Sequence, residues 1–235
     1  QFDGVMNYLF TAPTIAFIAG DRVKMELVES PSYFPYPPIS AKEYGQKIQD
    51  LLALYPWEIQ LTQLNLLDSH DTARLISVAG GDQASVELAT LLLFTFPGAP
   101  SIYYGDEVGL EGHLDPDSRR SFPMPDSWDQ DVLAYHKKLI SIRHQYPALR
   151  TGSYNILYAE GMVYGFARCL ENEELIVMVN SGTESAEINV TVTDLKTLPN
   201  QLIYGAGKFS WKQENDTTEL VVYLPPRQGI ILANC

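Results

Sequence analysis

The change of sequence pattern near residue 150 constrains the fold of this chain more than any other feature. Before that point, short apolar runs alternate with helical patterns, which is typical of beta-alpha units around a parallel sheet. After it, strand-like runs separated by turn residues follow one another, which indicates an antiparallel sandwich. We therefore predict two domains, an α/β domain over residues 1–149 and an all-β domain over residues 150–235.

Three beta-alpha units are predicted in the first domain. Their strands are the runs Phe2–Phe10, Leu64–Leu67 and Ser101–Tyr104. The helices begin at a Ser40–Glu43 capping box, at an Asp82 cap and near Val132. The middle helix is apolar nearly all round, so we expect it to need cover from neighbouring helices. The second domain is predicted to contain the strands Tyr154–Tyr158, Val163–Leu170, Leu175–Asn180, Ala186–Val192, Gln201–Tyr204, Leu220–Leu224 and Ile230–Leu232.

Charge and composition exclude several classes of partner. The formal net charge of -13 opposes a phosphate backbone, and no Lys and Arg cluster is interleaved with aromatic residues, so nucleic-acid binding is not predicted. No apolar run reaches the ~20 residues of a membrane span. The two cysteines, Cys169 and Cys235, have no CxxC or histidine spacing, so neither a disulfide framework nor a zinc site is implied. We expect no metal and no cofactor.

Polar residues follow each predicted strand of the first domain. In a parallel sheet or barrel, ligands bind at the carboxyl ends of the strands, because the loops converge there. These ends carry Asn7-Tyr8, Asp68–Asp71 and Tyr103–Glu107. The adjacent His70 and Asp71 supply one neutral donor and one carboxylate, a pairing suited to a sugar ring in which positive charge develops.

Each of these segments also has an alternative interpretation. The His70-Asp71 pair could be a helix N-cap with a buried neighbour. Asp106-Glu107 is more often the start of a solvated loop, and Asp115–Arg120 could be a surface turn with a local ion pair. The loop from Gly105 to about Asp129 has no periodicity, and loops of that length in compact domains are usually functional.

Four segments in order carry a family resemblance. They are Phe2–Tyr8, Leu66–Thr72, Pro97–Glu107 and Asp115–Arg120. With them the chain resembles the C-terminal part of the alpha-amylase superfamily of glycoside hydrolases, in its neopullulanase, cyclomaltodextrinase and maltogenic amylase branch. The resemblance implies that the three strands are the last three of a (β/α)8 TIM barrel, and that the antiparallel β-sandwich is the C-terminal domain of these enzymes.

The resemblance also implies roles for individual residues. Asp71 matches the residue that stabilises the transition state, and it is the predicted catalytic residue of this chain. His70 is expected to bind ring hydroxyls, and Tyr8, Asp115 and Arg119 are expected to bind substrate, the last two on the non-reducing side of the cleaved bond. No residue here replaces the family's nucleophilic Asp and general-acid Glu, which lie on earlier strands.

These implications predict a retaining alpha-glucan hydrolase acting on alpha-1,4 glucosidic bonds, with alpha-1,6 bonds left open as a second linkage. The chain alone is expected to be inactive. Its expected partners are alpha-glucan oligosaccharides and either the missing N-terminal part of the barrel or a second copy, because Phe2–Phe10 would leave an unpaired edge. The alternative is a non-catalytic glucan-binding or assembly module. The branch and the lack of a secretory signal lead us to expect a cytoplasmic protein.

Overall fold

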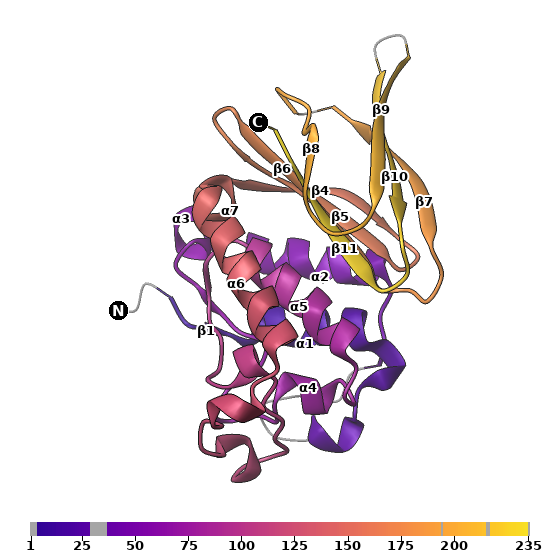
Figure 1. Cartoon of the computed structure of the whole chain (residues 1–235). Helices are drawn as coiled ribbons and strands as arrows, with labels where there is room; N and C mark the ends of the chain where they lie inside the picture. The colour runs from indigo at the N-terminus through magenta and orange to yellow at the C-terminus, as the bar shows by residue number, and fades with distance from the viewer. Residues whose placement is uncertain (1–3, 29–36, 194, 215–216, 235) are drawn as a thin grey trace.

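The computed structural model describes residues 4–28, 37–193, 195–214 and 217–234, and it has a helical part and a β-sandwich (Figure 1). In Figure 1 the long helices form a layer beneath the sandwich, and the loops that follow the short parallel strands lie at the opposite end of the helical part. The predicted change from mixed α/β to antiparallel structure is therefore observed. No helix in the described residues is long and apolar enough to cross a membrane.

The helical part contains a three-stranded parallel sheet in the order β1-β2-β3. Its strands are β1 (Met6–Asn7), β2 (Leu64–Asn65) and β3 (Ala99–Pro100). The three predicted strands are wrong in their bounds, since a helix begins at Tyr8, β2 ends at Asn65, and residues 101–103 have no regular structure. Residues Tyr8–Phe10 form a short apolar run, and such a run does not distinguish a buried helix from a buried strand. Residues 2 and 3 lie outside the described residues.

Four long helices surround this sheet. They are α1 (Tyr8–Ala19), α2 (Ala41–Ala53), α5 (Gln83–Thr95) and α6 (Gln130–Gln145). Both predicted caps are present: Ser40 and Glu43 form a reciprocal capping box, and the Asp82 carboxylate accepts from the Ser85 amide. The short helices are η1 (Gly20–Arg22), η2 (Met25–Leu27), α3 (Trp57–Gln60), α4 (Leu75–Val78), η3 (Asp106–Val108), η4 (Asp117–Arg119), η5 (Pro125–Ser127) and α7 (Ala148–Thr151).

The apolar helix α5 is covered within this chain. It contacts α1, α6, α7 and strand β11 (Gln228–Ala233) of the sandwich, and its residues from Leu88 to Thr95 are all buried. The helix thus has the cover that its apolar surface was expected to need, and this cover comes from within the described part of the chain. The sandwich supplies the cover that a neighbouring barrel helix was expected to supply.

The sandwich consists of a five-stranded sheet in the order β4-β5-β6-β11-β8 and a three-stranded sheet in the order β7-β10-β9. The remaining strands are β4 (Ser153–Glu160), β5 (Val163–Leu170), β6 (Glu173–Asn180), β7 (Ala186–Val192), β8 (Gln201–Tyr204), β9 (Lys208–Glu214) and β10 (Thr217–Leu224). All pairs are antiparallel. Strand β9 was not predicted, although Phe209 and Trp211 alternate with Lys and Ser as in an edge strand with one exposed face.

Arg168 on β5 joins the sandwich to the helical part. The guanidinium is fully buried, and its Nη1 atom donates to the carbonyl oxygens of Thr95 at 2.5 Å and Leu149 at 3.0 Å. Its other nitrogens donate to Gly152 at 3.0 Å and Ser153 at 2.9 Å. One side chain thus satisfies carbonyl groups from the end of α5 and from the segment between the two parts, which fixes their relative position.

Candidate functional site

A buried chain of amide side chains links β1 and β2 to the residue Pro97, which precedes β3. The Asn7 Nδ2 atom donates to Asn65 Oδ1 at 2.8 Å, and the Asn65 Nδ2 atom donates to the Pro97 carbonyl oxygen at 2.7 Å. Directly after Asn7, the Tyr8 hydroxyl lies 2.8 Å from Ser69 Oγ. Tyr8 is thereby held against the loop that carries His70 and Asp71.

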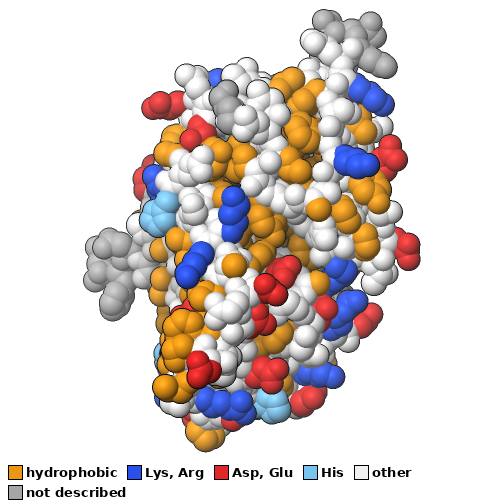
Figure 2. All heavy atoms as spheres, viewed as in Figure 1, with side chains coloured by type: hydrophobic (Ala, Val, Ile, Leu, Met, Phe, Trp, Pro, Cys, Tyr) orange, Lys and Arg blue, Asp and Glu red, His pale blue; other side chains and the backbone are white. Residues whose placement is uncertain are grey.

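Four of the predicted site residues form one polar cluster. His70 Nε2 lies 3.2 Å from Asp71 Oδ1, and Arg119 Nη2 lies 3.8 Å from the same oxygen. Arg119 Nε pairs with Asp115 Oδ1 at 2.8 Å and donates to the His70 carbonyl oxygen at 3.0 Å. Each of the four side chains is about half exposed, so the cluster is open to a ligand from solvent. Figure 2 shows acidic, basic and histidine side chains gathered at the lower end of the molecule, where the loop that follows β3 lies in Figure 1.

The side chains of this cluster do not cap helix α4. Asp68, not the His70-Asp71 pair, accepts the amide of Leu75 at the start of α4, at 2.6 Å. The N-cap interpretation of His70-Asp71 is therefore wrong. The local ion pair expected of a surface turn is present between Arg119 and Asp115, but the same guanidinium also reaches Asp71 on another loop.

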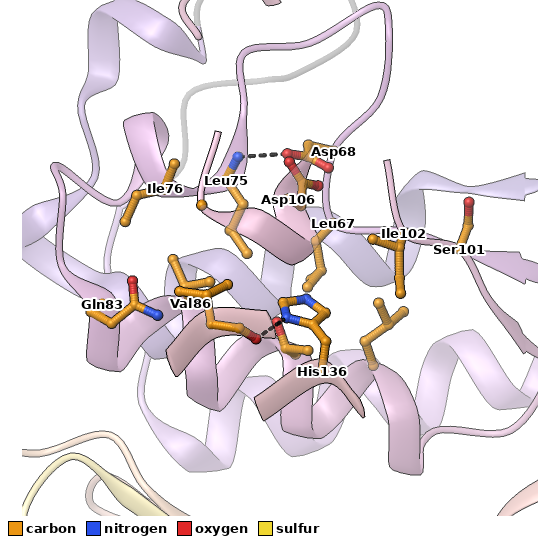
Figure 3. A pocket seen from close by; sticks show the side chains of 14 residues that line it. Leu67, Asp68, Leu75, Ile76, Gln83, Val86, Ser101, Ile102, Asp106 and His136 are labelled. Carbon is orange, nitrogen blue, oxygen red and sulfur yellow. Dashed lines mark hydrogen bonds between the residues drawn. The ribbon is translucent and has the colours of Figure 1, made fainter. Parts of the chain in front are cut away.

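Asp106 is not the start of a solvated loop, so that interpretation is wrong. Its carboxyl pairs with Arg74 Nη1 at 2.9 Å and lies beside the carboxyl of Asp68 (Figure 3). Burial and the neighbouring Asp68 carboxylate raise the pKa of Asp106 well above its ordinary value, and burial also raises the pKa of Asp68. Two neighbouring carboxyls with raised pKa values, of which only Asp106 pairs with Arg74, are expected to share a proton. The neighbouring Glu107 accepts from the Gly105 amide at 2.7 Å.

A narrow cavity of about 20 Å³ lies beneath these residues, which leaves room for about one water molecule. Figure 3 shows the carboxyls of Asp68 and Asp106 on one side of it and the His136 ring on the other. His136 Nδ1 lies 2.9 Å from the Val132 carbonyl oxygen and therefore carries a proton, and burial lowers the pKa of this histidine. The cavity is too small for a sugar ring. A glucan would have to bind at the exposed cluster of His70, Asp71, Asp115 and Arg119.

Sequence reasoning missed Arg74, and it named Asp68 and Asp106 without predicting their roles. The signal for Arg74 is a charged residue placed between Ala73 and the apolar start of α4, where a solvent-exposed side chain is not expected.

Among the residues that the structure describes, no three His, Cys, Asp or Glu side chains lie close enough together to hold a metal ion.

Comparison with known families separates the same two parts of the chain. Residues 1–128 match the alpha amylase catalytic domain, and residues 152–231 match the alpha-amylase C-terminal domain. The chain belongs to the alpha-amylase family. This is a family of glycoside hydrolases, in agreement with the resemblance carried by the four sequence segments.

Individual relatives are alpha-glucan hydrolases by name. The chain is 33% identical to a cyclomaltodextrinase of Geobacillus thermopakistaniensis over 99% of this chain and 37% of that protein. It is 32% identical to neopullulanase 2 of Thermoactinomyces vulgaris over 100% of this chain and 37% of that protein. A crystal structure of the debranching enzyme of Nostoc punctiforme superposes with a TM-score of 0.95 at 62% identity, over 100% of this chain and 48% of that chain. The chain thus spans less than half the length of each of these relatives.

Proposed function

We propose that this chain supplies the C-terminal part of the active site of a retaining alpha-glucan hydrolase. The observation that carries the proposal is the half-exposed carboxylate of Asp71, held beyond the end of β2 between the His70 imidazole and the Arg119 guanidinium. The hydrolase activity of the named relatives supports the substrate class. The proposed bond is the alpha-1,4 glucosidic bond, with alpha-1,6 bonds as a second linkage to be tested.

Asp71 is proposed to stabilise the oxocarbenium-like transition state. In glycoside hydrolysis positive charge develops on the sugar ring, and a fixed carboxylate lowers the energy of that charge more than the energy of the neutral ground state. His70 is proposed to donate from Nε2 to a ring hydroxyl. Since Nε2 lies 3.2 Å from Asp71 Oδ1, a sugar would bind by joining or replacing this contact.

Tyr8, Asp115 and Arg119 are proposed to bind neighbouring glucose units. Tyr8 lies beside Ser69 at the start of the Asp71 loop, so a sugar that contacts Asp71 also approaches the Tyr8 ring. The Asp115 carboxylate and the Arg119 guanidinium, 2.8 Å apart, together offer acceptors and donors to vicinal hydroxyls. We place this pair on the non-reducing side of the cleaved bond.

Residues 1–149 are proposed to be the last three units of a (β/α)8 barrel, and residues 150–235 its C-terminal sandwich domain. The parallel order β1-β2-β3 supports this arrangement. Further support comes from the open side of β1, where Val5 and Leu9 are 56% and 61% exposed although both are apolar. The proposed occupant of this edge is the N-terminal part of the barrel, and a second copy of the chain is the alternative.

The chain alone is proposed to be inactive. A retaining glycosidase places two carboxyls about 5–5.5 Å apart across the bond, and one of them acts as an acid in apolar surroundings. Asp71 and Asp115 are half exposed and both contact Arg119. Asp68 is buried and accepts from the Leu75 amide, and Asp106 pairs with Arg74. None of these four carboxyls is placed as a nucleophile and acid pair.

The test uses a barrel fusion, in which this chain is joined after the part of the Nostoc punctiforme enzyme that it does not match. We expect the purified fusion to release reducing sugar from maltooligosaccharides, and the chain alone to release none. Hydrolysis by the rigorously purified chain would show that the missing carboxyls are not needed. A folded but inactive fusion that still binds maltooligosaccharides would favour the non-catalytic glucan-binding module instead.

A further inference from the structure

Arg74 connects the two loops that carry the proposed glucan-binding residues. Its backbone amide donates to the Gly112 carbonyl oxygen at 2.9 Å, and its Nη1 atom donates to the Tyr104 carbonyl oxygen at 2.8 Å. Arg74 itself follows the His70-Asp71 segment, whereas its two acceptors belong to the loop that continues to Asp115 and Arg119. One residue therefore makes both backbone and side-chain contacts across the base of the site.

The surroundings of the guanidinium favour arginine over any other cation. The side chain is fully buried, and its carbon Cζ stands 4.4 Å from the centre of the Tyr103 ring and 4.9 Å from that of Tyr104. Within the described residues, Nε and Nη2 have no hydrogen-bond partner, so the aromatic faces take the place of acceptors. A planar, weakly hydrated guanidinium tolerates this environment, whereas a compact ammonium requires closer acceptors.

The exposed end of the loop has no comparable anchor. Arg119 makes ion pairs with Asp115 and Asp71 at about half exposure, and such exposed pairs hold a loop only weakly. The Tyr104 hydroxyl extends the buried anchor outward by donating to the Arg120 carbonyl oxygen at 2.7 Å. The position of Arg119 relative to Asp71 therefore depends on the contacts made at Arg74.

Close packing at Gly112 shows that the loop is fitted to Arg74. A Cβ atom at Gly112 would lie 2.9 Å from the Asp117 carbonyl oxygen and 3.2 Å from Arg74 Cδ. Gly112 thus lies between the Arg74 stem and helix η4, which begins at Asp117, and leaves no room for a side chain at this position. A shift of the Arg74 side chain would be passed directly to the segment that contains Arg119.

We propose that Arg74 is a positioning residue for glucan binding, which locks the loop of residues 103–120 onto the loop of residues 68–74 and so sets Arg119 against Asp71. The proposal rests on the proposed function of those residues. A merely structural role would be different: Arg74 would neutralise buried Asp106, and lysine would serve equally well.

The first test is hydrogen exchange on the chain itself, which needs no activity. In Arg74→Met and Arg74→Lys we expect the amides of residues 106–119 to exchange at least about tenfold faster, the scale of losing one hydrogen bond to a charged group. The matched control is Arg227→Met. Like Arg74, Arg227 has a buried Nε atom that has no hydrogen-bond partner in the described residues. Its guanidinium donates to the carbonyl oxygens of Ile18 and Ser181, which do not belong to these loops. Unchanged exchange of the loop in Arg74→Lys would overturn the proposal, even if Arg74→Met fails to fold.

The second test is kinetic and uses the barrel fusion. We expect Arg74→Lys to raise KM for long maltooligosaccharides at least about tenfold while kcat changes less. The reason is that the loop with Asp115 and Arg119 would shift, whereas the loop with Asp71 would stay in place. The Arg227→Met fusion should retain the unmodified KM. Faster loop exchange with unchanged KM would overturn the positioning role. An inactive unmodified fusion would instead contradict the proposed function, and it leaves the exchange result to decide whether Arg74 anchors the loop.

Discussion

Arg119 Nη2 lies 3.8 Å from Asp71 Oδ1, and this contact joins a loop after β3 to a loop after β2. The two side chains are 49% and 47% exposed, and an exposed pair of this kind stabilises a fold by only about 0–1 kcal/mol. The contact is therefore weak enough for a ligand to replace. Its importance lies in the placement of a guanidinium beside the proposed transition-state stabiliser.

Arg119→Ala in the barrel fusion should impair the use of long maltooligosaccharides more than that of short ones. The truncated side chain no longer binds a distant glucose unit, so we expect kcat/KM for long substrates to fall about tenfold more than for short ones. Steady-state kinetics with a chain-length series provides the measurement. The neighbouring Arg120→Ala is the control, because Arg120 pairs with Asp117 and not with Asp71. An equal loss on all lengths would count against a subsite role.

The Asp68–Asp106 pair should make stability fall as the pH rises. Burial and Asp68 raise the pKa of Asp106, so the folded state binds a proton that the unfolded state releases at about pH 4. This contribution is complete below the unfolded pKa and is lost as the pH rises through the raised folded pKa. Urea unfolding from pH 4 to 9 should show the free energy of unfolding of Asp106→Asn declining less with pH than that of the unmodified chain.

An opposite control is available at Asp82. Burial raises the pKa of Asp82, but its hydrogen bond with Ser85 and the charge of Arg227 lower it overall. Its contribution to stability is present above the unfolded pKa and is lost as the pH falls through the folded pKa. The free energy of unfolding of Asp82→Asn should therefore be lower than that of the unmodified chain at neutral pH, and the difference should vanish in acid. This pH dependence is opposite to that expected for Asp106→Asn. Parallel pH profiles for Asp106→Asn and the unmodified chain would contradict the shared proton.

Arg168→Met should destabilise the chain by about 3 kcal/mol or more, since each buried carbonyl left without a donor costs about 1–3 kcal/mol. Arg168 donates hydrogen bonds to the carbonyl oxygens of Thr95, Gly152 and Ser153. The carbonyl oxygen of Leu149 would keep a second donor, Arg143. The exposed Arg150→Met is the control. Denaturant unfolding followed by circular dichroism gives the free energies, and equal values for the two variants would show that Arg168 does not hold the two parts together.

The isolated chain should associate in dilute solution. Among the described residues, no strand pairs with the outer side of β1, and Val5, Met6 and Leu9 are exposed in or next to this strand. Light scattering should give a mass above 26.3 kDa, and Leu9→Lys should lower it by placing a charge at the edge. The control is Leu54→Lys, which changes an apolar residue that is 53% exposed after α2. A well-behaved monomer of the unmodified chain would refute this prediction.

The features that the sequence predicted well are those fixed by local pattern. Strands β5, β7 and β8 have the predicted bounds, because alternating apolar residues and turn residues define a strand without reference to the rest of the fold. The Ser40–Glu43 capping box is equally local. The start of α1 at Tyr8 was not predictable in this way, since an apolar run is compatible with a helix and with a buried strand.

In the candidate site too, the residues in local motifs were predicted, and a pair formed between two loops was not. His70, Asp71, Asp115 and Arg119 were predicted as separate motifs, and the structure brings their side chains into one cluster. Arg74 was missed because its partner Asp106 follows a different strand, and no local pattern indicates a pair formed by two loops that meet only in the folded sheet.

The most direct test of the account is kcat of the barrel fusion with Asp71→Asn. The substitution keeps the shape of the side chain and removes its charge, so we expect kcat to fall at least ~10²-fold, the scale of losing one electrostatic stabiliser, with circular dichroism and unfolding unchanged. Asp126→Asn, an exposed carboxylate on the loop after β3, should leave kcat as it is. A near-normal kcat in Asp71→Asn would contradict the assignment of Asp71 as the transition-state stabiliser.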